Sequence, residues 1–420
     1  MKIIFSTIKY LKFIFMISLL TFFPIIVRAE IIAYNDEQNI IEQFVKSDTT
    51  YLINKIINLK EDTLHIPNNC VLKFSKNGKI CNGTVIGSNT TIESLKCLIF
   101  ENVIIDGTWN NQCVYSQWLN LIEGGESNNQ QIENLMTLCN GINLTYLYTQ
   151  EGEYYLTAIK NSAPIRVPSN TYWHNKSTIK LKGCNYTKYS LVLLSKVENV
   201  TIEGGEFFGD LITHQGSEGE WGHGIKCGGS KNIVLKNLTC RNFWGDGIDL
   251  IEGLDFKNQA TIICDNVVID NVKCLYNRRQ GLSIEAAQNV KILNSVFSHT
   301  GKLKKTSPCA GIDIEPWINN GKKLFNITIS NCIMSNNKGP DLQIYIPKHF
   351  NYSKKDFINL TIENCQMGFS FLCGAIGVDF KECDINDIIR IDNSDHIRID
   401  SKTIIKEQLL NENGQNIVIK

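Results

Sequence analysis

The sequence predicts an all-β protein: a single right-handed parallel β-helix, or solenoid, with a short N-terminal capping helix. Five six-residue segments between residues 222 and 344 can be aligned. In each, two apolar positions flank a variable, mostly polar one, which is the period of a strand with one buried face. Pairs of asparagines five residues apart recur beside these segments, at intervals of 23 to 37 residues. A fixed unit with insertions of variable length is typical of a solenoid.

The aligned segments are expected to send two columns of side chains into the interior. They span residues 222–227, 245–250, 279–284, 309–314 and 339–344. The first column is Ile225, Ile248, Leu282, Ile312 and Leu342, and the second is Cys227, Leu250, Ile284, Ile314 and Ile344.

The asparagine pairs are expected at the corners between strands. Asparagine tolerates a left-handed backbone, and its side-chain amide can bond to the same amide one coil away. The pairs are Asn232/Asn237, Asn266/Asn271, Asn289/Asn294, Asn326/Asn331 and Asn359/Asn364.

With these segments and asparagine pairs, the chain resembles the pectin-lyase-like superfamily of right-handed parallel β-helices. Its members are mostly polysaccharide lyases, glycoside hydrolases, epimerases and phage tailspikes. The resemblance covers most of the chain after the first 29 residues. It implies the fold and a polysaccharide partner, whereas the chemistry depends on the site, because one scaffold carries all of these activities.

Residues 1–29 are expected to form a secretory signal peptide. Lys2, Lys9 and Lys12 precede an apolar run over residues 13–27, and Ala29 is a small residue suited to signal peptidase. Cleavage would give a secreted or periplasmic protein with no further membrane contact. A retained membrane anchor is the other interpretation of the same pattern, although the apolar run is short for a spanning helix.

The rest of the chain is expected to form one domain in three parts. Residues 30–165 would provide the N-terminal cap and first coils, including an amphipathic helix over Gln130 to Cys139. Residues 166–400 would form the regular β-helix, and residues 401–420 a C-terminal closing segment.

The charge balance and the cysteine content indicate which partners and which cysteine chemistry to expect. Lys+Arg 42 against Asp+Glu 42 leaves no net charge to attract nucleic acid, so none is expected as a partner. The 15 cysteines are odd in number and placed like small apolar residues, so buried free thiols are expected. Stacked strands would also allow disulfides between Cys240 and Cys274 or between Cys332 and Cys365. No CxxC pair or Cys/His cluster with zinc spacing occurs in the sequence.

The outward positions of the aligned strands carry acids that core packing does not require. Asp246, Asp249, Asp313 and His223 are the candidate catalytic residues. His223 should lie beside Asp246 on the neighbouring coil. Asp249 and Asp313 would be two strand spacings apart, about 9–10 Å, close to the separation of about 6.5–9.5 Å used by inverting glycosidases.

Further polar and aromatic residues flank the same stripe and are candidates for substrate binding. They combine cations for an acidic sugar with aromatic rings on which sugars stack. They are Lys226, Arg278, Arg279, Gln280, Glu285, Glu315, Trp244 and Trp317.

The sequence favours glycoside hydrolysis, and two other functions remain open. Paired carboxylates indicate a glycoside hydrolase, for which no metal or cofactor is assigned. A polysaccharide lyase would use Lys226, Arg278 or Arg279 as the base and Ca²⁺ to neutralise a uronate, with Asp249, Asp313 and Glu315 as ligands. A tailspike-like solenoid would bind carbohydrate through the same residues without catalysis.

Overall fold

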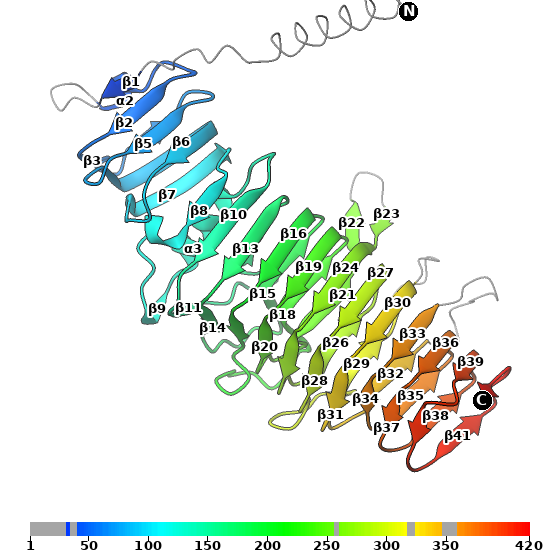
Figure 1. Cartoon of the computed structure of the whole chain (residues 1–420). Coiled ribbons are helices and arrows are strands. Elements are labelled where there is room, and N and C mark those ends of the chain that lie inside the picture. Colours follow the sequence, from blue (N-terminus) through cyan, green and yellow to red (C-terminus); the bar gives the residue numbers. More distant parts are fainter. Residues whose placement is uncertain (1–30, 34–39, 256–259, 317–323, 347–358) are drawn as a thin grey trace, which may run out of the picture.

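The computed structural model describes residues 31–33, 40–255, 260–316, 324–346 and 359–420, which form an elongated stack of parallel strands (Figure 1). From residue 113 onward, successive strands enter three sheets in a fixed order, and each coil returns to the first sheet. The predicted parallel β-helix is therefore confirmed. The predicted signal peptide lies outside the described residues, and no helix among those described is long and apolar enough to cross a membrane.

The first sheet of each coil has twelve strands, all parallel to their neighbours. It contains β8 (Cys113–Tyr115), β10 (Thr145–Thr149), β13 (Thr171–Asn175), β16 (Glu198–Glu203), β19 (Lys231–Lys236), β24 (Cys264–Asp270), β27 (Ala287–Leu293), β30 (Phe325–Ser330), β33 (Leu360–Glu363), β36 (Ile376–Lys381), β39 (Asp395–Ile399) and β42 (Val418–Ile419).

The second sheet has eleven short strands. It contains β9 (Gly124–Ser127), β11 (Glu153–Leu156), β14 (Thr178–Leu181), β17 (Glu206–Phe208), β20 (Thr239–Arg241), β25 (Lys273–Leu275), β28 (Val296–Ser298), β31 (Ile333–Ser335), β34 (Gln366–Met367), β37 (Asp384–Ile385) and β40 (Ile404–Ile405).

The third sheet has ten strands and includes the aligned segments of the sequence. It contains β12 (Ile165–Arg166), β15 (Lys188–Ser195), β18 (Trp221–Gly228), β21 (Ile248–Ile251), β26 (Gln280–Ile284), β29 (Ala310–Ile314), β32 (Leu342–Tyr345), β35 (Ser370–Cys373), β38 (Ile389–Asp392) and β41 (Leu409–Glu412). The antiparallel hairpin of β22 (Gly253–Asp255) and β23 (Ala260–Ile262) is an insertion between β21 and β24.

The N-terminal coils form a separate seven-stranded sheet that precedes the regular solenoid. A short helix, α2 (Ile40–Gln43), follows its first strand. The strands are β1 (Ile31–Ala33), β2 (Thr50–Ile53), β3 (Ile56–Asn58), β4 (Thr63–His65), β5 (Val71–Phe74), β6 (Lys79–Glu93) and β7 (Phe100–Trp109).

The predicted amphipathic helix is present as α3 (Asn129–Leu138), preceded by the 3₁₀ turn η1 (Ser116–Trp118). It buries Ile132, Leu135 and Leu138 and contacts β7 and β12. In chain order α3 follows β8 of the first sheet and β9 of the second. In this coil the helix therefore lies where later coils have a strand of the third, ten-stranded sheet. The helix therefore covers the edge of β12, while β1 to β7 extend the stack beyond it (Figure 1).

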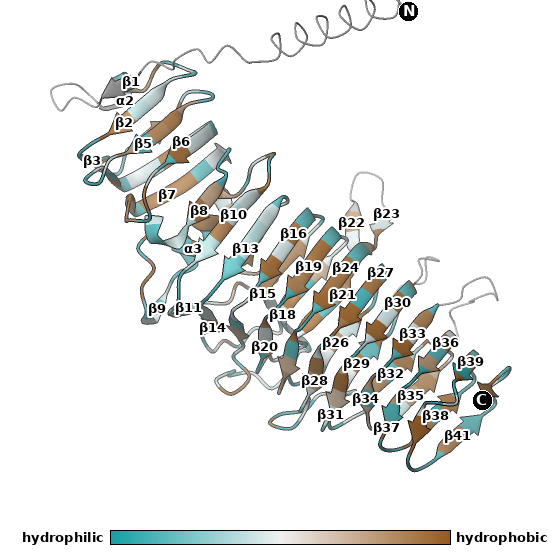
Figure 2. Ribbon diagram, viewed as in Figure 1, coloured by the Kyte–Doolittle hydropathy of each residue, from teal (hydrophilic) through white to brown (hydrophobic). Residues whose placement is uncertain are grey.

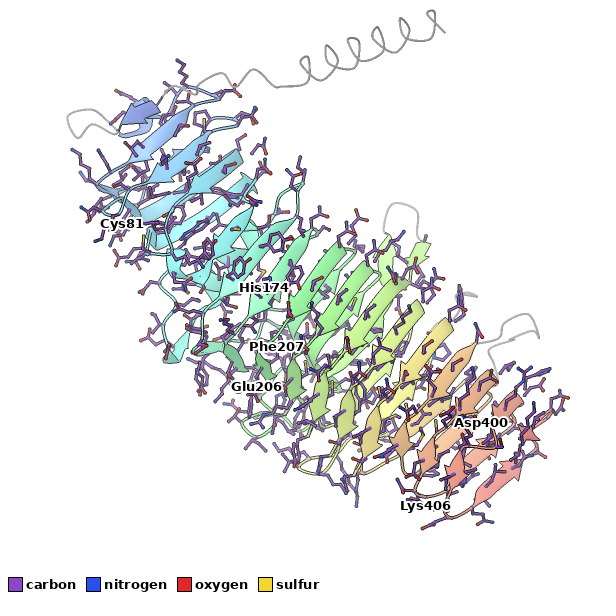
Figure 3. All side chains as sticks on the ribbon, in the orientation of Figure 1. Cys81, His174, Glu206, Phe207, Asp400 and Lys406 are labelled. Atoms are coloured by element: carbon purple, nitrogen blue, oxygen red, sulfur yellow. The ribbon has the colours of Figure 1, made fainter. Side chains whose placement is uncertain are left out.

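The core runs the length of the stack and is built from alternate residues of each strand. Both predicted inward columns are buried, with no exposed surface. On β17, Phe207 is buried while its neighbour Glu206 is partly exposed and pairs with Arg241 at 2.6 Å (Figure 3). Hydrophobic colour accordingly concentrates on the strands and hydrophilic colour on many of the turns (Figure 2).

The predicted asparagine corners are confirmed. All ten asparagines of the five pairs have positive φ, between 49° and 57°. Asn266 Nδ2 donates to Asn232 Oδ1 at 2.8 Å, and Asn271 Nδ2 to Asn237 Oδ1 at 2.8 Å. Asn289 does not continue the series of hydrogen bonds through Asn232 and Asn266, because its Nδ2 donates to Asp265 Oδ1 instead.

All 15 cysteines are free, as expected, and most are buried. Cys240 and Cys274 are register partners on β20 and β25 without forming a disulfide. Cys332 and Cys365 also remain thiols, and the backbone N–H of Cys332 donates to Cys365 Sγ at 3.4 Å.

Candidate active site

A column of polar residues runs across the middle of the ten-stranded sheet. Register pairing aligns Lys226, Asp249, Ser283, Asp313 and Gln343 on five consecutive strands. The residues on either side of each one in β18 to β29 belong to the hydrophobic core. Because strand side chains alternate between faces, this column lies on the outer face of the sheet.

We call the outward carboxylates of this region the acidic row. Asp249 and Asp313 lie on strands β21 and β29, Asp246 lies just before β21, and the other two directly follow β26 and β29. Its members are Asp246, Asp249, Glu285, Asp313 and Glu315.

His223 lies between two members of the acidic row. Its Nδ1 is 3.2 Å from Asp246 Oδ2, and its Nε2 is 3.6 Å from Asp249 Oδ2. All three side chains are at most 2% exposed. His223 Nε2, Asp246 Oδ1 and Asp249 Oδ1 are buried without a hydrogen-bond partner among the described residues. Buried polar atoms are normally satisfied, so these three have room for a further partner such as an ordered water.

Two cations neutralise part of the row. Lys226 Nζ lies 3.4 Å from Asp249 Oδ2, and the lysine side chain remains 20% exposed. Arg279 Nη1 lies 3.1 Å from Asp246 Oδ2 and also donates to Gln280 Oε1 at 2.7 Å. Burial alone would lower the pKa of Arg279, but the nearby carboxylates, led by Asp246, raise it above its ordinary value. Arg279 is therefore a permanent cation.

Asp313 has a different environment. Its carboxyl group is fully buried and accepts hydrogen bonds from the side-chain amides of Gln280 and of Gln343, the latter at 3.1 Å. Burial, followed by the charge of Glu315, raises the pKa of Asp313 to about 8. Asp313 is consequently protonated at neutral pH and can donate a proton.

The two glutamates at the edge of the row are also shifted. Burial and the charge of Asp249 raise the pKa of Glu285 well above its ordinary value. Burial likewise raises the pKa of Glu315, while Arg279 partly offsets this. The row thus combines carboxyl groups whose pKa is raised with carboxyl groups that lie beside cations, and perturbed groups of this kind cluster at functional sites.

Arg278 and Trp244 are predicted to bind substrate, but their side chains contact other parts of the protein. Arg278 Nη1 donates to the backbone oxygens of Gly219 and Trp244, at 2.8 and 3.0 Å. The Trp244 ring stacks on His214 at 3.9 Å and under the Arg278 guanidinium at 3.7 Å. Two groups this close to one ring centroid must cover opposite faces. Neither face of Trp244 is free for a sugar, so both residues brace the loops beside the row.

Two further expectations concern Trp317 and calcium. Trp317 lies outside the described residues. Among the residues that are described, Asp249, Asp313 and Glu315 do not bring their oxygens together as a metal-binding group. The structure therefore does not assemble the Ca²⁺ ligand set expected for a lyase.

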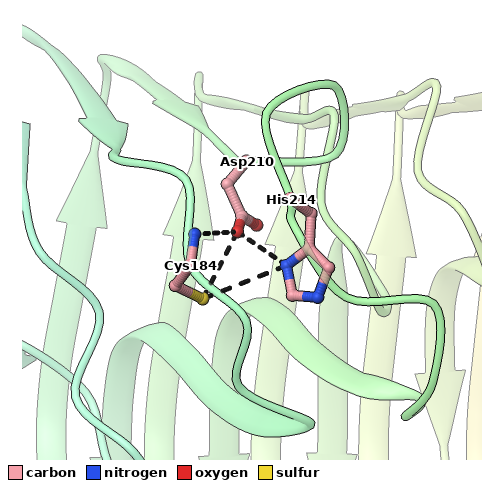
Figure 4. A group of neighbouring side chains, drawn as sticks. All are labelled: Cys184, Asp210 and His214. Atoms are coloured by element: carbon pink, nitrogen blue, oxygen red, sulfur yellow. Dashed lines mark hydrogen bonds and ion pairs between the residues drawn. The ribbon is translucent and has the colours of Figure 1, made fainter.

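Sequence reasoning missed a second polar cluster next to the row. It consists of Cys184, Asp210 and His214 (Figure 4), with Tyr189 against it. Cys184, Asp210 and His214 lie in connections between β14 and β15 and between β17 and β18, which the repeat does not cover. The four-residue spacing of Asp210 and His214 was the only signal available.

A cavity of about 750 Å³ lies on the same outer face, toward the N-terminal end of the solenoid. It is bounded by α3, and its lining includes Arg166 and Leu193. Arg166 pairs in register with Leu193, and Leu193 with Lys226, so the cavity and the acidic row share one column of the ten-stranded sheet.

Comparison with known proteins identifies the solenoid. Residues 157–317 match the family model described as "Right handed beta helix region". Two proteins of Bacillus subtilis (strain 168) are similar over part of the chain. YclG is 31% identical over 134 residues, covering 30% of this chain and 23% of YclG. YorA, which derives from the SPbeta prophage, is 26% identical over 182 residues, covering 40% of this chain and 31% of YorA. The chain thus spans less than a third of the length of either relative.

A solved structure with a similar course is the A-module of mannuronan C-5 epimerase AlgE4 from Azotobacter vinelandii. The TM-score is 0.48 at 10% identity, covering 73% of this chain and 97% of the module. The family match and the observed strand order lead to one assignment. The fold is a right-handed parallel β-helix, and residues 157–317 of the chain carry the match to that family model.

Proposed function

We propose that this protein is a secreted, carbohydrate-active enzyme that hydrolyses glycosidic bonds in a polysaccharide at the acidic row. The observation that carries the proposal is the contrast between Asp249 and Asp313. They lie in one outward column with only Ser283 between them, yet Asp249 lies beside the Lys226 ammonium and Asp313 accepts hydrogen bonds from neutral amides.

In this mechanism Asp313 is the general acid. Its raised pKa of about 8 keeps a proton available for the leaving-group oxygen at neutral pH. Asp249, which lies 3.4 Å from Lys226 Nζ, would activate the attacking water as general base. Two strand spacings, about 9–10 Å, separate their backbones. That distance leaves room for water and favours inversion of the anomeric configuration.

The surrounding residues have supporting roles. His223 would hold Asp246 and Asp249 in place and, with its unpartnered Nε2, offer a hydrogen bond to the substrate. Lys226 and Arg279 would attract acidic or strongly hydroxylated sugars. Gln280 orients the proton-bearing Asp313.

A polysaccharide lyase is the second candidate, and the position of Lys226 favours it. This side chain is partly exposed and adjoins the row, so it could remove the proton next to a uronate carboxylate. The metal ligands proposed for such a reaction are not gathered in the described residues, which places the lyase second.

The test is incubation of the purified protein with a panel of plant, algal, bacterial and host polysaccharides. Hydrolysis would release reducing ends without ultraviolet absorbance from unsaturated uronates, and proton NMR of the first product would show the inverted anomer. Absorbance from unsaturated uronates would identify a lyase. Binding of a polysaccharide with no new ends would contradict both reactions and identify a tailspike-like binding solenoid.

A further inference from the structure

A buried polar cluster that shares no residue with the acidic row joins two loops of the solenoid. Each of these loops connects a strand of the second sheet to a strand of the third. Cys184 lies in the connection from β14 to β15, whereas Asp210 and His214 lie in the loop from β17 to β18. Asp210 and His214 side chains have no exposed surface, and Cys184 is half-buried. The three side chains converge on one point (Figure 4).

One oxygen of Asp210 provides the centre of the cluster. Asp210 Oδ2 lies 2.9 Å from His214 Nδ1 and 3.4 Å from Cys184 Sγ, while Sγ and Nδ1 are 3.9 Å apart. The other oxygen, Oδ1, accepts a hydrogen bond from Tyr189 at 2.6 Å. A metal-binding carboxylate has this arrangement, with one oxygen facing the ion and the other held by a neighbouring side chain.

The separations suit a tetrahedral ion. Bonds of about 2.0–2.3 Å to sulfur, nitrogen and oxygen require ligand atoms about 3.3–3.8 Å apart. The S–O and S–N separations of 3.4 and 3.9 Å already lie at or near this range. Only the N–O contact of 2.9 Å, a hydrogen bond, would have to lengthen by a few tenths of an ångström.

Charge provides a second reason for a cation. Asp210 is buried, and among the described residues its ion-pair partner is His214 rather than a lysine or arginine. A buried carboxylate is stabilised by a cation or by several hydrogen bonds, and Asp210 accepts hydrogen bonds from Tyr189, His214 and the Cys184 backbone N–H. Arg278, the nearby cation, stacks on Trp244 and donates to backbone oxygens instead. A divalent ion would provide the missing charge.

We propose that Cys184, Asp210 and His214 form a binding site for a zinc-like divalent cation. Thiolate, imidazole and carboxylate together suit Zn²⁺ and exclude Ca²⁺ and Mg²⁺, which take oxygen ligands. On binding, the thiol proton leaves to solvent as the sulfur–metal bond forms, and the proton that His214 Nδ1 donates to Asp210 moves to Nε2 or to solvent as the nitrogen–metal bond forms. Three protein ligands leave the fourth position to water.

The ion would fasten the loop over residues 209–220 to the loop before β15. The loop over residues 209–220 leads directly into β18, which carries His223 and Lys226. The ring of His214 also stacks on Trp244, two residues before Asp246. The site would therefore stabilise one side of the acidic row without touching substrate, and it stands whether or not the row hydrolyses polysaccharide.

The experiment titrates the full chain, stripped with chelator, with Co²⁺ and Cd²⁺ while following the thiolate-to-metal absorption bands. One equivalent per chain is expected to give the band. Cys184→Ser should abolish it, whereas Cys97→Ser, which changes another half-buried free cysteine, should keep it. Asp210→Asn should weaken binding by at least about tenfold. Absence of a band, or a band that persists in Cys184→Ser, would overturn the proposal.

A second measurement on the wild-type chain covers the case in which a variant fails to fold. Zn²⁺ should protect Cys184 from alkylation, as measured by peptide mass spectrometry, and leave the alkylation of Cys97 unchanged. Equal alkylation of Cys184 with and without Zn²⁺ would contradict the site.

Discussion

Asp249 on β21 and Asp313 on β29 lie in the same outward column of the ten-stranded sheet, with strand β26 between them. Their surroundings differ although their burial does not, since each is at most 1% exposed. Lys226 approaches Asp249, whereas Asp313 receives hydrogen bonds from uncharged amides. In the proposed mechanism these two carboxyl groups have opposite tasks in proton transfer.

Replacing Asp313 by Asn should change how stability depends on pH. Because the folded-state pKa of Asp313, about 8, exceeds its ordinary value of 3.8, the folded wild type loses stability as pH rises between these values. Asn resembles the protonated acid and does not ionise. Urea unfolding should therefore show the variant gaining on wild type between pH 4 and 8, by about 1.4 kcal/mol for each pKa unit that the environment imposes.

The matched control is Asp379→Asn, at a more exposed position on β36. It should leave the pH dependence unchanged. Identical pH profiles for wild type and Asp313→Asn would show that Asp313 titrates normally.

Glu315→Gln should shift the alkaline limb of the pH–rate profile to lower pH. The charge of Glu315 is one of the causes that raise the pKa of Asp313, so its removal lowers that pKa below about 8. The general acid then loses its proton at lower pH. The pH dependence of kcat/KM measures this shift, with Glu363→Gln on β33 as the control. If the alkaline limb does not move, Asp313 is not the group whose loss of a proton produces that limb.

Arg279→Met should destabilise the protein strongly. The substitution leaves the buried carboxylate of Asp246 without its arginine partner. Breaking a buried pair in this way costs about 3–5 kcal/mol. By contrast, Lys73→Met removes the exposed Lys73–Glu93 pair, where about 0–1 kcal/mol is expected. Equilibrium urea unfolding compares the two, and equal losses would mean that Asp246 is not held as a charged group.

Asn266 tests the corner ladder. Its φ of 57° disfavours a Cβ-branched or ordinary side chain, and its amide donates to Asn232. Asn266→Ala should lose both advantages, whereas Asn266→Gly loses only the hydrogen bond. We expect Ala to be less stable than Gly by about 1 kcal/mol, since the left-handed conformation costs about 1–2 kcal/mol outside glycine and asparagine. A Gly variant no more stable than Ala would refute the conformational explanation.

The fold could be predicted because its determinants repeat. Every coil restates the same apolar columns and the same asparagine corner, so Ile248 and Asn266 could be placed from spacing alone. The contact between His223 and Asp246 was also predictable, because it joins equivalent ends of neighbouring coils.

Residues on the long connections could not be placed this way. Trp244 and Arg278 are close in sequence to the acidic row, yet Trp244 lies between Arg278 and His214, because the loop over residues 209–220 folds back over it. The path of that loop follows from its own contacts rather than from the repeat. The cluster of Cys184, Asp210 and His214 was missed for the same reason.

The central claim is that the outward acids of the ten-stranded sheet perform chemistry on a polysaccharide. The most direct test is the rate of reducing-end release by Asp249→Asn beside Asp379→Asn, on the substrate that the polysaccharide panel identifies. The account predicts that Asp249→Asn loses activity by about 10²–10⁴-fold, as expected for removal of a general base, and that Asp379→Asn retains it. Wild-type rates in Asp249→Asn would contradict the account.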